Sequence, residues 1–166
     1  YEILRCLVGS EMCIRDRTNL MRKINYIVVH CSATREGCTL TSEVLEAEHR
    51  RRGFRTTGYH YYIRRDGTVL GTRSLELPGA HCRGHNKYSI GICYEGGLDA
   101  RGNPKDTRTP EQRSALHLLV YQLLQQFRNA RVCGHRDLSP DLDGDGTVEP
   151  WEWVKQCPCF EVSKEF

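Results

Sequence analysis

A short apolar run, Ile24 to His30, restricts the folds that this chain can adopt. Its β-branched and aromatic residues are bounded by a polar loop, which is typical of a buried strand that ends at His30. Helix-forming residues follow from Ser42 to Arg52, and Gly53 is a stop signal. A buried strand followed by a helix indicates an α/β protein, with a histidine placed where a strand ends.

Further strands are predicted along the chain. The segments Tyr59 to Arg64 and Thr68 to Gly71 flank Asp66-Gly67, and Asp-Gly between such runs predicts an antiparallel hairpin. Ser89 to Tyr94 alternates small and apolar residues, and a last short strand is expected from Arg131 to Cys133. The sequence thus alternates between strand and helix patterns.

The clearest helix begins at Thr109, the predicted N-cap, with Pro110 as the first helical residue and Gln112 as the reciprocal partner of a capping box. A single apolar stripe follows on this helix, formed by Ala115, Leu116, Leu119, Val120, Leu123, Leu124 and Phe127. One stripe packs against one sheet. We expect a single α/β domain whose mixed central β-sheet is flanked by helices.

Length and composition indicate how many domains the chain forms and which partners it is expected to lack. The chain has 166 residues, and residues 1–20 are expected to be a non-native or disordered tail, leaving one domain at residues 21–166 with Met21 as the natural start. Its formal charge of +3 is too weak to predict binding to nucleic acid, and no apolar run is long enough for a membrane span. We expect a monomer.

The segment from Cys133 to Cys159 concentrates side chains that bind metals or move protons. The nine cysteines are irregularly spaced, so most are predicted to be reduced and buried, Cys93 and Cys38 among them. A catalytic zinc takes three protein ligands and keeps one open position. His30, His135 and Cys157 could form such a set, although residue types alone leave structural histidines open as the alternative.

A second metal pattern lies inside the same segment. Residues 141–152 match the twelve-residue EF-hand loop, with a glycine at position six and a glutamate at position twelve, but no entering helix precedes them. The predicted calcium ligands are Asp141, Asp143, Asp145, Thr147, Glu149 and Glu152. The alternative is a solvated acidic loop. A calcium ion here would be structural and would help to present Lys155 and Cys157.

Five segments together resemble the zinc N-acetylmuramoyl-L-alanine amidases, a family that includes phage amidases and the peptidoglycan recognition proteins. They are Val-Val-His30-Cys-Ser-Ala-Thr, Gly-Tyr59-His-Tyr-Tyr-Ile-Arg-Arg-Asp-Gly-Thr-Val, His81 through Ser89-Ile-Gly-Ile, Gly-His135-Arg-Asp and Lys155-Gln-Cys157-Pro. The resemblance runs in order from Ile24 to about Phe160. The acidic loop departs from it, because the phage members have a much shorter connection there.

The resemblance implies a role for each matched residue. His30, His135 and Cys157 align with the zinc ligands, and the Lys-x-Cys-Pro match favours Cys157 over Cys159 as the third ligand. Zinc would polarise the scissile carbonyl and activate water. Tyr59 and Lys155 align with the catalytic pair, which would donate or relay a proton and stabilise the oxyanion.

The substrate follows from the same resemblance. His81 matches a loop of the substrate cleft and is predicted to bind substrate. The expected reaction is hydrolysis of the amide between N-acetylmuramic acid and L-alanine in peptidoglycan, by a protein of phage or prophage endolysin type. The alternative is a noncatalytic peptidoglycan-binding module. Without an export signal, the protein is expected to stay in the cytoplasm until it is released to the cell wall.

Overall fold

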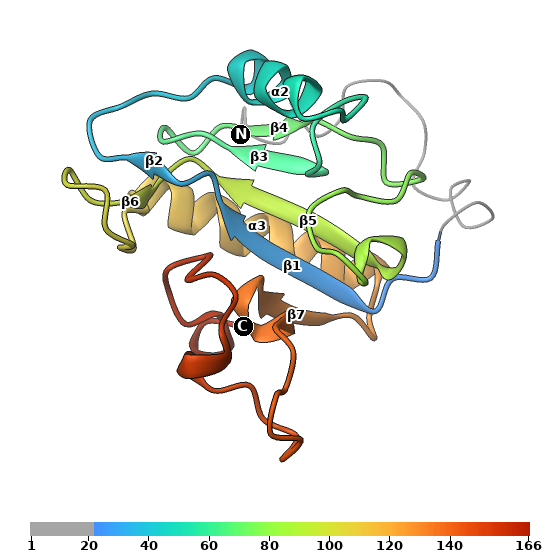
Figure 1. The fold of residues 1–166 in the computed structure, drawn as a ribbon. Coiled ribbons are helices and arrows are strands. Elements are labelled where there is room, and N and C mark those ends of the chain that lie inside the picture. The colour runs from blue at the N-terminus through green and yellow to red at the C-terminus, as the bar shows by residue number, and fades with distance from the viewer. Residues whose placement is uncertain (1–21) are drawn as a thin grey trace.

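A computed structural model describes residues 22–166, and the tail predicted at residues 1–20 lies outside the described residues. Within these described residues, the fold consists of two β-sheets and two α-helices (Figure 1). The strands are β1 Tyr26–Cys31, β2 Thr34–Arg35, β3 Tyr61–Ile63, β4 Val69–Gly71, β5 Ser89–Tyr94, β6 Gly97–Leu98 and β7 Arg131–Gly134. The helices are α2 Ser42–Arg51 and α3 Pro110–Gln126, with 3-10 turns η2 Asn86–Tyr88, η3 Arg136–Leu138, η4 Pro150–Glu152 and η5 Val162–Lys164.

The larger sheet has five strands in the order β4-β3-β5-β1-β7. Strand β1 pairs in parallel with β5 and β7, and β3 pairs in parallel with β5. Strand β4 is antiparallel to β3, as predicted for a hairpin, and Gly67 in the turn has a positive φ of 82°. The predicted mixed sheet in a single α/β domain is therefore confirmed.

The two helices cover opposite faces of this sheet (Figure 1). The capping box predicted at the start of α3 is present, and the helix packs its apolar stripe on one face. Side chains alternate along a strand, so Ile27 and Val29 of β1 face α3 while Val28 and His30 face the other side. There, Leu45 of α2 packs against β3 and β5. This alternation places His30 on the α2 side.

The structure differs from the sequence predictions in detail. The first strand begins at Tyr26 and continues through Cys31, one residue beyond His30. Cys93 is buried as predicted, but the prediction for Cys38 is wrong, because this residue is exposed after the turn that closes from Arg35. The two-stranded sheet of β2 and β6 was not predicted, since each strand has only two residues. No helix of the described residues is long and apolar enough to cross a membrane.

Candidate active site

Two histidines meet at the carboxyl ends of neighbouring parallel strands. His30 is the penultimate residue of β1, and His135 directly follows β7. The strands are in a register that pairs Val29 with Gly134, and the His135 backbone N–H donates to the Val29 carbonyl at 3.1 Å. The two imidazole centroids lie 4.6 Å apart. Parallel pairing thus brings together side chains that are more than a hundred positions apart in the sequence.

Cys157 joins the two histidines from the C-terminal segment. The Arg136 N–H donates to the Cys157 carbonyl at 2.9 Å, and the next residue, Pro158, packs so closely on Gly134 that a Cβ there would lie 2.6 Å from its ring. The Cys157 Sγ lies 3.8 Å from His30 Nδ1 and accepts the Cys31 N–H at 3.2 Å. One ligand atom from each of the three predicted zinc ligands lies within 4.8 Å of the other two.

Burial sets the protonation states of His30 and His81. His30 is 1% exposed, and burial, followed by the nearby charges of His81, His135 and Lys155, lowers its pKa well below the ordinary value. Burial is also the main cause that lowers the pKa of His81 to about 3. Both rings are therefore neutral near pH 7, and a neutral imidazole is the form that binds a metal.

Tyr59 and Lys155, the predicted catalytic pair, both lie near His30. Tyr59 precedes β3, and its ring centroid is 5.0 Å from that of His30. Burial raises the pKa of the Tyr59 hydroxyl well above its usual value, so the group keeps its proton at neutral pH. Lys155 is exposed, two residues before Cys157, and its charge is among the causes that lower the pKa of His30.

His81 makes contacts that the sequence did not reveal. The residue is 9% exposed, and its ring places Nδ1 2.9 Å from His30 Nε2 and Nε2 3.2 Å from Ser89 Oγ. His81 and His30 are separated by 51 positions, and no local pattern links them. Its predicted contact with substrate stays a prediction.

Cys159, the competing thiol, is directed elsewhere. Its Sγ lies 3.8 Å from Cys31 Sγ, and among the described residues the group of ligand atoms around His30 contains Cys157 instead. Cys159 adopts a positive φ of 70°, which turns the chain just after Pro158. Cys157 as the third zinc ligand, which rests on the resemblance, stays a prediction.

The acidic loop is an exposed turn between β7 and Cys157. Two sets of its side chains offer ligand atoms within 4.8 Å of one another: Asp141, Asp143 and Glu152, and Asp143, Asp145 and Glu149. Thr147 belongs to neither set. The buried Glu152 carboxylate accepts the backbone N–H groups of Leu142 and Glu149, which closes the loop. Calcium in this loop stays a prediction.

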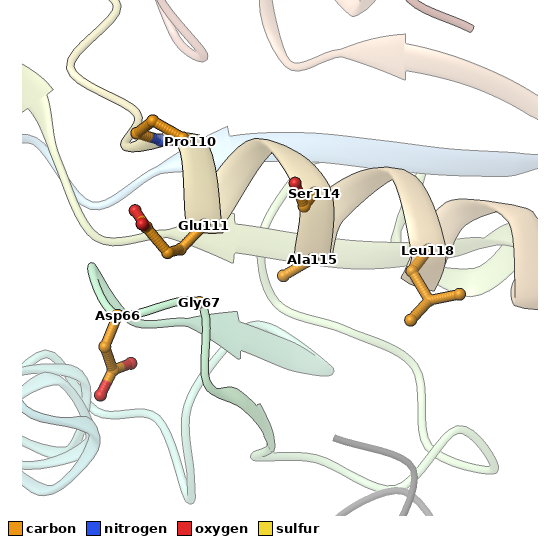
Figure 2. A pocket seen from close by; sticks show the side chains of 7 residues that line it. All are labelled: Asp66, Gly67, Pro110, Glu111, Ser114, Ala115 and Leu118. Atoms are coloured by element: carbon orange, nitrogen blue, oxygen red, sulfur yellow. The ribbon is translucent and has the colours of Figure 1, made fainter. Parts of the chain in front are cut away.

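A cavity of about 330 Å³ lies away from these groups, between the first turns of α3 and the hairpin turn (Figure 2). It is lined by Asp66, Gly67, Pro110, Glu111, Ser114, Ala115 and Leu118. Because α3 covers the face of the sheet opposite His30, this cavity is not part of the histidine site. The groups able to do chemistry therefore lie in the cluster of side chains around His30.

Comparison with known proteins decides the family. The N-acetylmuramoyl-L-alanine amidase profile matches residues 20–158, which is most of the chain. The chain belongs to this family. An endolysin of Klebsiella phage KP32 is 35% identical over 143 residues, covering 86% of this chain and 85% of the phage protein. The family match and the endolysin relative confirm the predicted activity, that of an N-acetylmuramoyl-L-alanine amidase acting on peptidoglycan.

The chain is also similar to a solved amidase structure and to a peptidoglycan-recognition protein. The N-acetylmuramoyl-L-alanine amidase LysC from Clostridium intestinale has a TM-score of 0.67 and 26% identity, covering 87% of this chain and 82% of LysC. A peptidoglycan-recognition protein of Drosophila melanogaster is 30% identical over 121 residues, which are 70% of this chain and 65% of that protein. The fold predicted from the resemblance is therefore confirmed.

Proposed function

We propose that this amidase is a zinc hydrolase that uses His30, His135 and Cys157 to hold the ion. The observation that carries the proposal is the convergence of a His30 nitrogen, a His135 nitrogen and Cys157 Sγ within 4.8 Å. Two imidazoles and a thiolate suit the borderline-soft character of zinc, and a three-residue set leaves a fourth position open. A zinc ion held there would supply Lewis acidity toward the scissile carbonyl and would activate water.

The surroundings of Cys157 fit a metal-binding thiolate. The Cys31 backbone N–H points at its sulfur at 3.2 Å, and such a hydrogen bond stabilises negative charge on the sulfur without a counter-ion. The low pKa of His30 keeps that ring available as a neutral ligand. His30 is thus deprotonated at neutral pH, as metal binding requires.

Tyr59 and Lys155 would act on the reacting amide. The Tyr59 hydroxyl keeps its proton at neutral pH, so it can donate a hydrogen bond or relay a proton at the carbonyl oxygen or the leaving nitrogen. Lys155 carries its ammonium on the exposed side, where an incoming substrate would place the developing negative charge. The expected products are a free lactyl carboxylate on muramic acid and a stem peptide that begins with L-alanine.

The test uses purified cell walls. The zinc-loaded protein should lower their turbidity and release peptides with a new amino-terminal alanine, detected by amino-group labelling and mass spectrometry. His135→Ala and chelation should each abolish release, whereas His117→Ala, which changes a surface histidine on α3, should not. Release that survives both His135→Ala and chelation would overturn the zinc mechanism.

The same assay separates the enzyme from a noncatalytic recognition module, the function suggested by the Drosophila relative. Tight binding to cell walls without release of peptides would favour recognition. The presence of Cys157 beside both histidines supports the enzyme.

The endolysin relative supports a further part of the proposal. We infer that the protein reaches the cell wall on release from the cell, as expected for a phage or prophage endolysin, and acts as a monomer. Gel filtration and fractionation of cells before and after lysis test these two points. Stable dimers, or activity in the medium of intact cells, would contradict them.

A further inference from the structure

The two nitrogens of His30 face different groups. Nδ1 lies 3.8 Å from Cys157 Sγ, on the side of the proposed metal, whereas Nε2 lies 2.9 Å from Nδ1 of His81. A neutral imidazole carries one hydrogen, and only the nitrogen without it can bind a metal. For Nδ1 to be the ligand, the hydrogen must therefore be on Nε2, where it points at His81.

His81 can accept that hydrogen because of its own second contact. If its Nδ1 accepts from His30, its hydrogen is on Nε2, and Ser89 Oγ lies 3.2 Å from that nitrogen as an acceptor. Ser89 is fully buried, so this hydroxyl is directed at protein groups and not at solvent. The opposite arrangement of hydrogens would leave one on His30 Nδ1, facing Cys157, and would block the ligand.

The His81 ring is held in place by its neighbours. Two glycines leave room for it: a Cβ at Gly79 would overlap the ring, and a Cβ at Gly91 would lie 2.6 Å from its Cδ2. The side chain of Asn86 accepts the His81 backbone N–H at 2.8 Å. With 9% of the residue exposed, the ring has little surface to offer a substrate.

We infer that His81 is a positioning residue, which fixes the orientation and tautomer of the ligand His30, with Ser89 completing the chain of hydrogen bonds. The inference rests on the proposed zinc function and replaces the substrate contact predicted for His81. Partners of this kind orient metal-bound histidines and raise their basicity, and their loss typically costs roughly 10- to 100-fold in metal affinity.

The test compares two substitutions of His81 by zinc competition with a chromophoric chelator. His81→Leu fills the space but accepts no hydrogen bond, whereas His81→Asn keeps an oxygen close to the position of Nδ1. We expect His81→Leu to weaken zinc binding roughly 10- to 100-fold and His81→Asn to recover most of the loss. A packing role predicts the reverse order, since asparagine is smaller and polar. His85→Leu, in the same loop with its ring against Tyr26, is the matched control and should bind zinc normally.

A second readout is independent of turnover. Nitrogen NMR of the histidine rings should place the hydrogen of His30 on Nε2 in the wild type and in His81→Asn, with that signal shifted in His81→Leu. If His81→Leu does not fold, Ser89→Ala should show a smaller loss of zinc affinity in the same direction. Equal zinc affinity and an unchanged His30 signal in a folded His81→Leu would overturn the inference. A wild type that binds no zinc would overturn the proposed function itself.

Discussion

The two parts of the segment from Cys133 to Cys159 hold their charged and metal-binding groups in opposite ways. His135 and Cys157, near its ends, contact β1, and the neutral His30 ring there is 1% exposed. The carboxylates of its middle part, residues 141–149, are exposed or half-buried, and none forms an ion pair with a described Lys or Arg. The groups of the first part are brought together by the fold, whereas Asp141 and Asp145 of the second accept backbone N–H groups of their own loop.

This difference predicts that the two parts respond to different metals. It also predicts a large effect on activity at the first part and a small effect on stability at the second. Loss of a ligand at the buried site should remove activity, since the donors are fixed and nothing replaces them. Loss of a carboxylate in the exposed loop should change stability slightly, because surface charges contribute little in water.

The largest effect is expected for Cys157→Ser. Serine is a poor zinc ligand in place of a thiolate, so we expect activity to fall by more than the roughly 100-fold typical of outer-sphere changes, with loss of bound zinc. Cys159→Ser is the matched control, because its sulfur contacts Cys31 and not the histidines. Zinc content by atomic absorption and release of stem peptides measure both. The assignment fails if Cys159→Ser is the inactive variant.

The next effect is expected for Tyr59→Phe. Removal of one positioned acid or base typically costs about 10²- to 10⁴-fold, so kcat should fall on that scale while zinc content and KM change little. Because burial raises the pKa of Tyr59 well above 10, ionisation of this hydroxyl should cause no loss of rate at any pH below 10. Tyr121→Phe, at a tyrosine 62% exposed on α3, is the control. A rate for Tyr59→Phe within a few-fold of wild type would exclude the proposed role.

Sequence patterns predicted the parts of this arrangement that depend on local rules. The β-branched and aromatic run from Ile24 to His30 indicated the buried strand β1, and the capping box at Thr109 located the start of α3 to the residue. Spacing could not show that His30 and His135 lie side by side, because their proximity depends on the register of β1 against β7. The contact of His81 with His30 and the Cys31 N–H on Cys157 likewise depend on packing between distant segments.

Elsewhere in the fold, the carboxylates of Asp106 and Glu165 are neutralised by a buried arginine, Arg108. The Arg108 side chain is fully buried, donates to both Asp106 and Glu165, and lies over the ring of Phe160. These hydrogen bonds lower the pKa of Glu165 against an opposing effect of burial. Among the described residues, no Lys or Arg pairs with the carboxylates of the acidic loop. The carboxylates around Arg108 therefore show, in the same protein, how strongly a paired cation affects stability.

Arg108→Met should lower the free energy of unfolding by about 3 kcal/mol, the lower end for a broken buried pair, because Arg113 still contacts both carboxylates. A depressed carboxyl pKa stabilises the fold above the unfolded pKa near 4.3, and this stability is lost as the pH falls through the folded value. The difference between wild type and variant should therefore shrink below about pH 4. Urea denaturation at several pH values measures it, with Arg113→Met, at a half-exposed arginine, expected to cost at most about 1 kcal/mol. A difference that does not vary with pH would show that Arg108 acts by packing alone.

The smallest effect is expected from calcium in the acidic loop. At a calcium concentration ten times the dissociation constant, binding to the folded state alone adds about 1.4 kcal/mol, or roughly 3 to 6 °C in Tm for a chain of this size. Asp143 offers a ligand atom to both sets of carboxylates, so Asp143→Asn should abolish the shift. Magnesium, which demands a smaller octahedral site, should give a weaker shift. An identical response of wild type and Asp143→Asn to calcium would mean that the loop is only a solvated connection, and that the fold alone holds Lys155 and Cys157 beside the histidines.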